Sequence, residues 1–189
     1  KQELGLEKDD RQDEIDRYLA WAQPPTDATR FSTGRVLAST LPFAIIHDGR
    51  WIDRQLGPER ARTSFPFRAL LDAGAVVTFG SGWLDRGSPL DGIYAAVTRR
   101  TLDGLHPQGW VPHQRLTVEE ALRAYTTAAA YAGFDEARTG ALTVGRLADF
   151  VIVDRDLFTV PSTDIPSVRV LMTVVGGDII FDRLRPTTS

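Results

Sequence analysis

Two neighbouring residues in this sequence carry groups that could move a proton or bind a metal ion. His47 and Asp48 stand side by side, a few residues after the apolar run 36–40. An imidazole next to a carboxylate suits a general base, and an imidazole nitrogen is also a frequent metal ligand. One histidine beside one aspartate equally describes an ordinary surface loop, so both interpretations stay open.

The other two histidines, His106 and His113, flank Trp110 in a segment rich in glycine and proline. A zinc site needs three or four ligands in a defined geometry, and two loop histidines without a third partner do not specify one. We therefore interpret this pair as part of the loop structure.

A glycine-rich segment, Gly80-Ser81-Gly82-Trp83, follows a second apolar run at 75–79. Ser81 does not lie in a Gly-x-Ser-x-Gly nucleophile elbow, because the first of these positions is Phe, so serine hydrolase chemistry is not expected. The Trp83 ring could stack against a substrate ring or acyl chain, or it could simply cover the site.

Two more charged residues, Asp85 and Arg99, follow this segment. Asp85 offers a carboxylate, three residues beyond Gly82. Arg99 is expected at the end of a helix, where its charge favours the helix dipole, although its guanidinium could also bind a substrate carboxylate through two nitrogens. The catalytic hypotheses thus rest on His47, Asp48 and Asp85, and the substrate-binding ones on Trp83 and Arg99.

The composition is that of an ordinary globular protein. The 189 residues are 42% hydrophobic and 25% charged, which allows a sizeable core. A net charge of −3 gives no basic field for nucleic acid or an anionic membrane. No apolar run is long enough to span a bilayer, and no cysteine is present for a disulfide or a thiolate site. We expect a cytoplasmic protein that binds neither nucleic acid nor membrane.

Helical and apolar segments alternate along residues 1–137. The apolar runs at 36–40 and 75–79 are typical of strands buried on both faces, as in a parallel sheet covered by helices. A helix is expected between them, from about residue 63 to 71. Two further helices begin at capping boxes, one formed by Ser88 with Asp91 and one by Thr117 with Glu120. The second of these is expected to continue to about Gly133.

The pattern changes near residue 138. Strands are expected at 150–153, 168–175 and 179–181, and the last two are joined by Gly176-Gly177, a pair that favours a type I′ hairpin turn. We therefore divide the chain into β/α units over 1–137 and β structure over 138–189. The fold class is α/β.

Several segments resemble the C-terminal part of the metal-dependent amidohydrolase superfamily, in particular its formamide deformylase-like branch. The order and the spacing of these segments both agree over residues 64–157, and a weaker match covers 20–62. The matching segments are 67–75, 80–83, 89–93, 95–99, 116–126 and 145–150.

The resemblance implies the C-terminal part of a (β/α)8 TIM-type barrel followed by strands of a small β-sandwich. Chemistry in such barrels lies at the C-terminal ends of the strands. In the family, zinc or another divalent metal is held there by histidines and an aspartate, and it activates water for attack on amide-like C–N bonds other than peptide bonds.

The positions that correspond to family metal ligands carry residues that cannot bind a metal. The aspartate after the last barrel strand corresponds to Gly82, and two histidines correspond to Ala44 and Trp21. Glycine and alanine have no donor atom, and the indole N–H only donates hydrogen bonds. We therefore predict no cofactor for this chain and no activity when it is alone.

Three hypotheses about function remain. The chain can belong to a hydrolase whose missing ligands come from an absent segment, a partner chain, or His47 and Asp48. It can be a non-catalytic relative, a fragment or degenerate copy that keeps the shape without the chemistry. It can also be a module that binds a small molecule near Trp83 and Arg99. A partial barrel leaves sheet edges unpaired, so we expect a missing N-terminal portion or a second copy to complete it.

Overall fold

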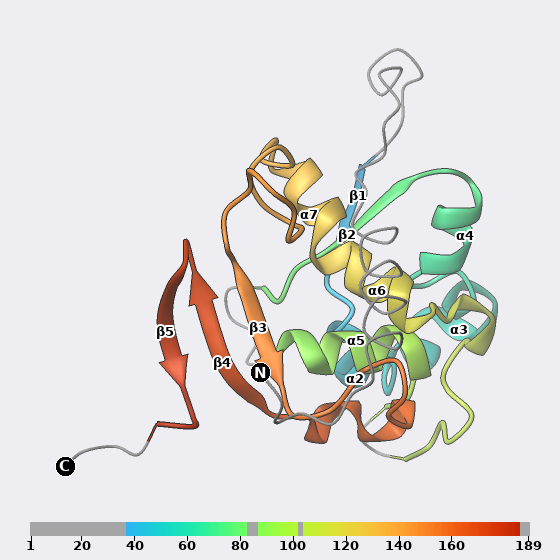
Figure 1. Cartoon of the computed structure of the whole chain (residues 1–189). Coiled ribbons are helices and arrows are strands. Elements are labelled where there is room, and N and C mark those ends of the chain that lie inside the picture. Colours follow the sequence, from blue (N-terminus) through green and yellow to red (C-terminus); the bar gives the residue numbers. More distant parts are fainter. Residues whose placement is uncertain (1–36, 83–86, 102–103, 186–189) are drawn as a thin grey trace.

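A computed structural model describes residues 37–82, 87–101 and 104–185 of the chain. The expected N-terminal helices, and with them Trp21, lie outside these ranges, as do Trp83 and Asp85. The described part is a mixed α/β structure with two separate sheets, one parallel and one antiparallel (Figure 1). No helix in this part is long and apolar enough to cross a membrane.

The first sheet consists of two parallel strands, as predicted. The expectation that both are buried on two faces is wrong for the strand at 37–40, where Leu37 is 41% exposed. Strand β1 (Leu37–Thr40) pairs with β2 (Val76–Phe79), with Leu37 opposite Val76 and Thr40 opposite Phe79. Three helices connect them: α2 (Ala44–Asp48), α3 (Ile52–Ala61) and α4 (Phe67–Asp72). Helix α4 begins four residues later than predicted, because Phe65 has a positive φ of 49° and Pro66 is not helical either.

The two predicted capping boxes are confirmed. Ser88 and Asp91 begin α5 (Pro89–Thr98), and Thr117 and Glu120 begin α6 (Val118–Tyr125), each with both reciprocal hydrogen bonds. The single long helix predicted after Thr117 is wrong, since the chain breaks at Thr126 before α7 (Thr127–Ala132). Thr126 Oγ1 donates to the carbonyl oxygen of Leu122 at 2.7 Å, a side-chain bond that often bends helices.

The second sheet is antiparallel and has the order β3-β4-β5. Its strands are β3 (Phe150–Val153), β4 (Val170–Val175) and β5 (Asp178–Asp182). The predicted hairpin is confirmed, with φ of 60° at Gly176 and 92° at Gly177, as a type I′ turn requires. Strand β4 starts two residues later than predicted, because the 3-10 helix η3 (Ser162–Ser167) extends up to Val168 through a Val168 N–H bond to Ile165.

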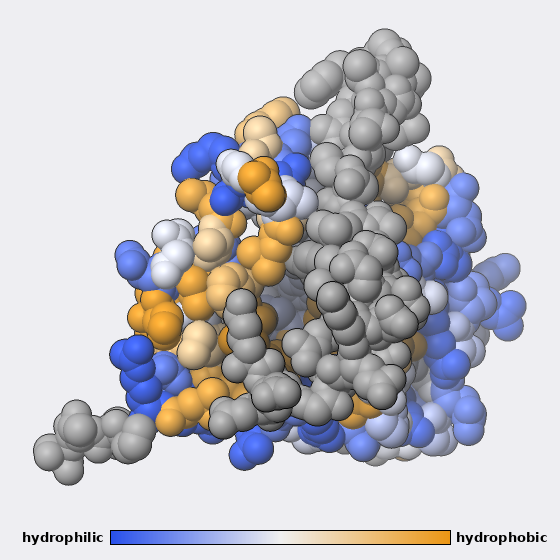
Figure 2. Space-filling model, viewed as in Figure 1, coloured by the Kyte–Doolittle hydropathy of each residue, from blue (hydrophilic) through white to orange (hydrophobic). Residues whose placement is uncertain are grey.

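The core lies between the first sheet and the helices. It contains Phe67 on α4, Phe79 on β2, Ile93 on α5 and Ala121 on α6, all at most 4% exposed. The second sheet, in contrast, exposes apolar side chains, including Val151 at 56% and others shown in Figure 2 on the side where β3, β4 and β5 lie. The assignment of these elements to part of a (β/α)8 barrel and to a small β-sandwich stays a prediction.

Candidate functional site

The first sheet brings two strand ends together at one edge. Because β1 and β2 are parallel and in register, Thr40 and Phe79 end side by side, and the Gly80 N–H donates to the carbonyl oxygen of Thr40 at 3.1 Å. The chain then continues through Ser81 to Gly82, which is exposed and has a φ of 73°. A positive φ of this size suits glycine, which has no Cβ. The same lack of a side chain means that Gly82 offers no donor atom to a metal ion.

Tyr125 lies beside these strand ends. Its ring meets the Phe79 ring edge-on at 5.4 Å between centres, and its hydroxyl packs against Gly92 so closely that a Cβ there would clash with it. Burial raises the pKa of Tyr125 to about 12, while the nearby Ser81 side chain opposes this shift. Tyr125 therefore keeps a protonated phenol beside the strand ends, with its hydroxyl buried against Gly92.

The sequence places Tyr125 in the helix predicted after Thr117 and gives its hydroxyl no role. The signal that points to its hydroxyl is Gly92, because a glycine inside a helix costs stability relative to alanine and often marks a close approach. Gly92 lies in α5 and Tyr125 at the end of α6, so the contact joins residues 33 positions apart.

Ala44, His47 and Asp48 all belong to α2. The expectation that His47 and Asp48 lie in a loop is wrong, because α2 starts right after Phe43 and includes both as its last residues. Both side chains are exposed, and the His47 ring packs edge-on against Phe43 at 5.0 Å. Ala44 begins the helix, four residues after β1 ends, and offers no donor atom.

Arg99 is fully buried, with an exposed fraction of 0%. Its Nε donates to the carbonyl oxygen of Trp110, and its two terminal nitrogens donate to those of Phe65 and Ser64, at 3.1, 2.9 and 3.3 Å. Burial lowers its pKa to about 10. The helix end was predicted at this position, and α5 does end at Thr98. The guanidinium joins loops in the interior rather than facing a surface that a substrate could reach.

His106 and His113 lie in the segment between α5 and α6, as the sequence indicates. His113 is part of the 3-10 helix η2 (Pro112–Gln114) and is exposed, whereas His106 is half-buried. Within residues 37–82, 87–101 and 104–185, no group of three or more His, Cys, Asp or Glu side chains is placed to hold a metal ion. The described side chains therefore do not form the divalent-metal site that the family resemblance implies.

Comparison with known proteins gives one family and several relatives. The amidohydrolase family matches residues 6–181. Protein LONG AFTER FAR-RED 3 of Arabidopsis thaliana is 36% identical over 159 residues, which are 83% of this chain and 27% of that protein. N-substituted formamide deformylase of Arthrobacter pascens is 32% identical over 120 residues, 63% of this chain and 22% of that protein.

The fold is also similar to a solved structure. An uncharacterized metal-dependent hydrolase from Pyrococcus horikoshii OT3 matches with a TM-score of 0.58 and 28% sequence identity, over 68% of this chain and 26% of that one. The chain thus spans about a quarter of the length of each of these three proteins.

Proposed function

Because this chain belongs to the amidohydrolase family, we propose that it corresponds to the C-terminal part of a metal-dependent hydrolase of amide-like C–N bonds, and that it does not catalyse this reaction by itself. The reaction class is supported by a relative named as an N-substituted formamide deformylase and by a structural neighbour named as a metal-dependent hydrolase. The substrate would be a small molecule with a C–N bond other than a peptide bond.

The lack of activity is supported above all by Gly82. This residue lies three positions beyond the end of β2, on the side where barrel enzymes place their catalytic groups. It has no side chain, and Ala44, at the start of the helix after β1, has no donor atom either. A metal in the family polarises the substrate and activates water. The described residues do not fit such an ion, so we derive no catalytic step through one.

The residues that are present can shape this edge without reacting. The Tyr125 hydroxyl is buried against Gly92, and the Tyr125 ring packs on Phe79, the last residue of β2. His47 and Asp48 remain as exposed groups on α2. None of these residues is an activated nucleophile.

The test combines metal content with turnover. The chain is purified without chelators, its zinc, manganese, iron and cobalt are measured by elemental analysis, and a panel of N-substituted formamides and small amides is assayed with and without added zinc. We expect less than about a tenth of an ion per chain and no turnover above buffer. Stoichiometric metal together with zinc-dependent turnover would overturn the proposed inactivity, and a longer protein that contains this chain and still fails to hydrolyse the panel would contradict the reaction class.

Completion of the fold by another segment is the second part of the proposal. In the part of the chain that the structure describes, β1 and β2 pair only with each other, so each leaves one edge free. Unpaired edges favour association with another strand. The antiparallel sheet adds exposed apolar side chains such as Ile180 at 65% and Phe181 at 42%. A preceding part of the same protein or a second copy would cover both features.

A further inference from the structure

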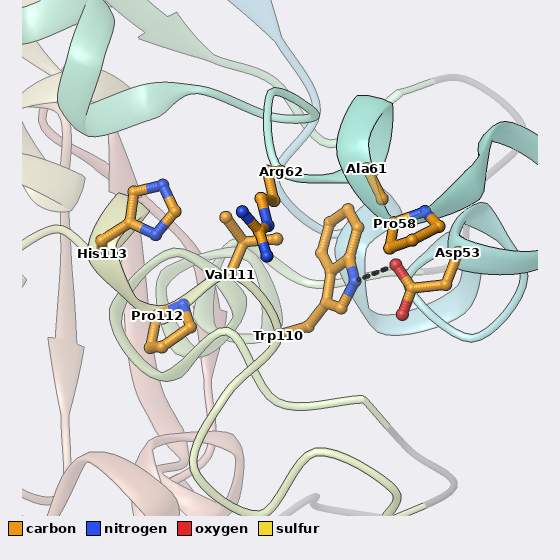
Figure 3. Close-up of a pocket in the computed structure, with 8 residues that line it drawn as sticks. All are labelled: Asp53, Pro58, Ala61, Arg62, Trp110, Val111, Pro112 and His113. Carbon is orange, nitrogen blue, oxygen red and sulfur yellow. Dashed lines mark hydrogen bonds between the residues drawn. The ribbon is translucent and has the colours of Figure 1, made fainter.

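A cavity of about 500 Å³ lies between helix α3 and the segment that leads into η2 (Figure 3). Its floor is the indole of Trp110, which is only 3% exposed. The indole Nε1 donates to Oδ1 of Asp53 at 3.1 Å, and Asp53 lies in the first turn of α3. This bond joins residues 57 positions apart and fixes the position of the indole. The second carboxylate oxygen of Asp53 accepts no hydrogen bond from the described residues.

The wall beside the indole is held in a rare backbone conformation. Val111 has φ of 48° and ψ of 61°, a left-handed geometry that a β-branched residue seldom adopts. It is enforced from both sides, because the Trp110 N–H donates to the Arg99 carbonyl oxygen and the Val111 carbonyl oxygen accepts from the Gln114 N–H at 3.0 Å. Strain of this kind gathers at ligand-binding and functional sites. Val111, Pro112 and His113 all line the cavity (Figure 3).

Charged and polar groups stand at two separate places on the rim. In Figure 3, Arg62 lies between His113 and Trp110, and Asp53 lies on the other side of the indole. Arg62 and His113 are both exposed, and within residues 37–82, 87–101 and 104–185 the Arg62 guanidinium forms no ion pair. The rim position at Arg62 therefore attracts a negatively charged group, and the rim position at Asp53 attracts a positively charged one.

We propose that this cavity binds a small zwitterion. Its carboxylate is held by the Arg62 guanidinium, with a further hydrogen bond from the His113 ring, and its ammonium group is held by Oδ2 of Asp53. Arginine suits this task because its planar fork of N–H groups matches a carboxylate. The part of the ligand between its two charged groups should be apolar, because the rings of Pro58 and Pro112 line the cavity. The site does not depend on the proposed hydrolase activity.

The test is a binding titration followed by nuclear magnetic resonance on the complete 189-residue chain. The probe is 4-(aminomethyl)benzoate, a flat zwitterion, and benzoate and benzylamine serve as probes with a single charge. The signal is the indole N–H of Trp110, identified by its disappearance in Trp110→Phe. We expect the chemical shift of this signal to change as probe is added and to reach a plateau. The zwitterion should bind at least about fivefold more tightly than either single-charge probe.

Variants separate the two rim positions from unspecific charge effects. Arg62→Ala and Asp53→Asn should each weaken binding of the zwitterion about fivefold, the range expected for one exposed charge pair. Asp53→Asn keeps an oxygen that accepts from the indole, so the floor is retained. Arg60→Ala is the matched control and should change binding less than twofold, because Arg60 is an exposed arginine in the last turn of α3, two residues before Arg62, and does not line the cavity.

Three results would overturn the proposal. The first is a Trp110 signal that does not shift with any of the three probes at 10 mM, which is on the order of the weakest affinities worth measuring. The second is equal affinity for the zwitterion and for benzoate. The third is an equal loss of affinity in Arg60→Ala and Arg62→Ala. Spectra of each variant without a probe show directly whether it is folded.

Discussion

Arg99 and Trp110 are joined by two hydrogen bonds, and each residue donates one of them. Nε of Arg99 donates to the carbonyl oxygen of Trp110 at 3.1 Å, and the backbone N–H of Trp110 donates to the carbonyl oxygen of Arg99 at 2.6 Å. The guanidinium carbon also lies 5.4 Å from the centres of both the Trp110 and the Phe67 rings. One buried cation thereby ties the end of α5 to α4 and to the segment before η2.

Replacing Arg99 by methionine should therefore lower the free energy of unfolding by about 3 kcal/mol, because one buried and two partly buried carbonyl oxygens lose their donor. Urea denaturation followed by circular dichroism measures this loss. Arg138→Met is the control, since the Arg138 side chain is 68% exposed in its ion pair, and a change below about 0.5 kcal/mol is expected. Unchanged stability in Arg99→Met, with weaker ligand binding, would instead support the substrate-binding hypothesis.

Gly92→Ala should destabilise the protein, although alanine in a helix is normally better than glycine by about 1 kcal/mol. The added Cβ would meet the hydroxyl and the ring of Tyr125, and overpacking of this kind costs about 1–3 kcal/mol. The double variant Gly92→Ala with Tyr125→Phe should regain part of the loss, because the nearest atom is removed. Thermal denaturation of the four variants in the cycle measures the coupling, and a stabilised Gly92→Ala would contradict the contact.

Stability should fall between pH 10 and pH 12 because of Tyr125. Burial raises its pKa to about 12 in the folded state, whereas the unfolded phenol ionises near its ordinary value of about 10. The folded state thus holds the proton over this range and the unfolded state loses it, so the stabilising contribution is complete below pH 10 and is lost as the pH approaches 12. Free energies of unfolding across this range should fall more steeply for the parent chain than for Tyr125→Phe. An equal fall in the free energy of unfolding with pH in both proteins would show that burial does not raise the pKa of Tyr125.

Glu120 should contribute to stability at neutral pH and lose this contribution in acid. Its carboxylate accepts from the Thr117 N–H at 2.8 Å and from Arg68 Nη1 at 2.8 Å. Burial acts to raise its pKa, but the bonds to Thr117 and Arg68 outweigh burial and hold the pKa below its ordinary value. The contribution is therefore present above the ordinary pKa and disappears as the pH falls through the lowered one.

Glu120→Gln should accordingly lose about 1 kcal/mol at pH 7, the usual worth of a helix cap, and clearly less at pH 3. Urea denaturation at both values measures the difference. Glu119→Gln is the matched control, because Glu119 forms an exposed pair with Arg123 within the same helix, and its loss should stay near 0.3 kcal/mol, as for exposed helix pairs. Equal losses for both variants would contradict the proposed role of Glu120.

Light scattering after size exclusion tests whether another segment completes the fold. The unpaired edges of β1 and β2 and the exposed apolar side chains of the second sheet lead us to expect dimers or larger species at micromolar concentration. Ile180→Lys and Phe181→Lys together should shift the population toward smaller species. A parent chain that is monomeric, monodisperse and cooperatively folded would rule this proposal out.

Family, strands and caps were predictable from the sequence because their causes are local. The capping boxes at Ser88 and Thr117 close within three residues, and the Gly176-Gly177 turn needs only two positive φ angles. Short apolar runs between helices likewise indicated the parallel pair β1 and β2. The segments similar to amidohydrolases also keep their spacing along the chain, which is why the family could be named without a structure.

The roles of single side chains were decided only by the tertiary structure. Arg99 reaches carbonyl oxygens of residues 34 and 35 positions away, and Trp110 binds Asp53 across 57 positions. No local pattern encodes such contacts, because they form only when distant helices pack together. From the sequence, Arg99 was therefore expected to favour a helix dipole or to bind a substrate, and the Trp110 segment to form a loop. Burial and hydrogen bonding place Arg99 in the core and Trp110 at the floor of a cavity.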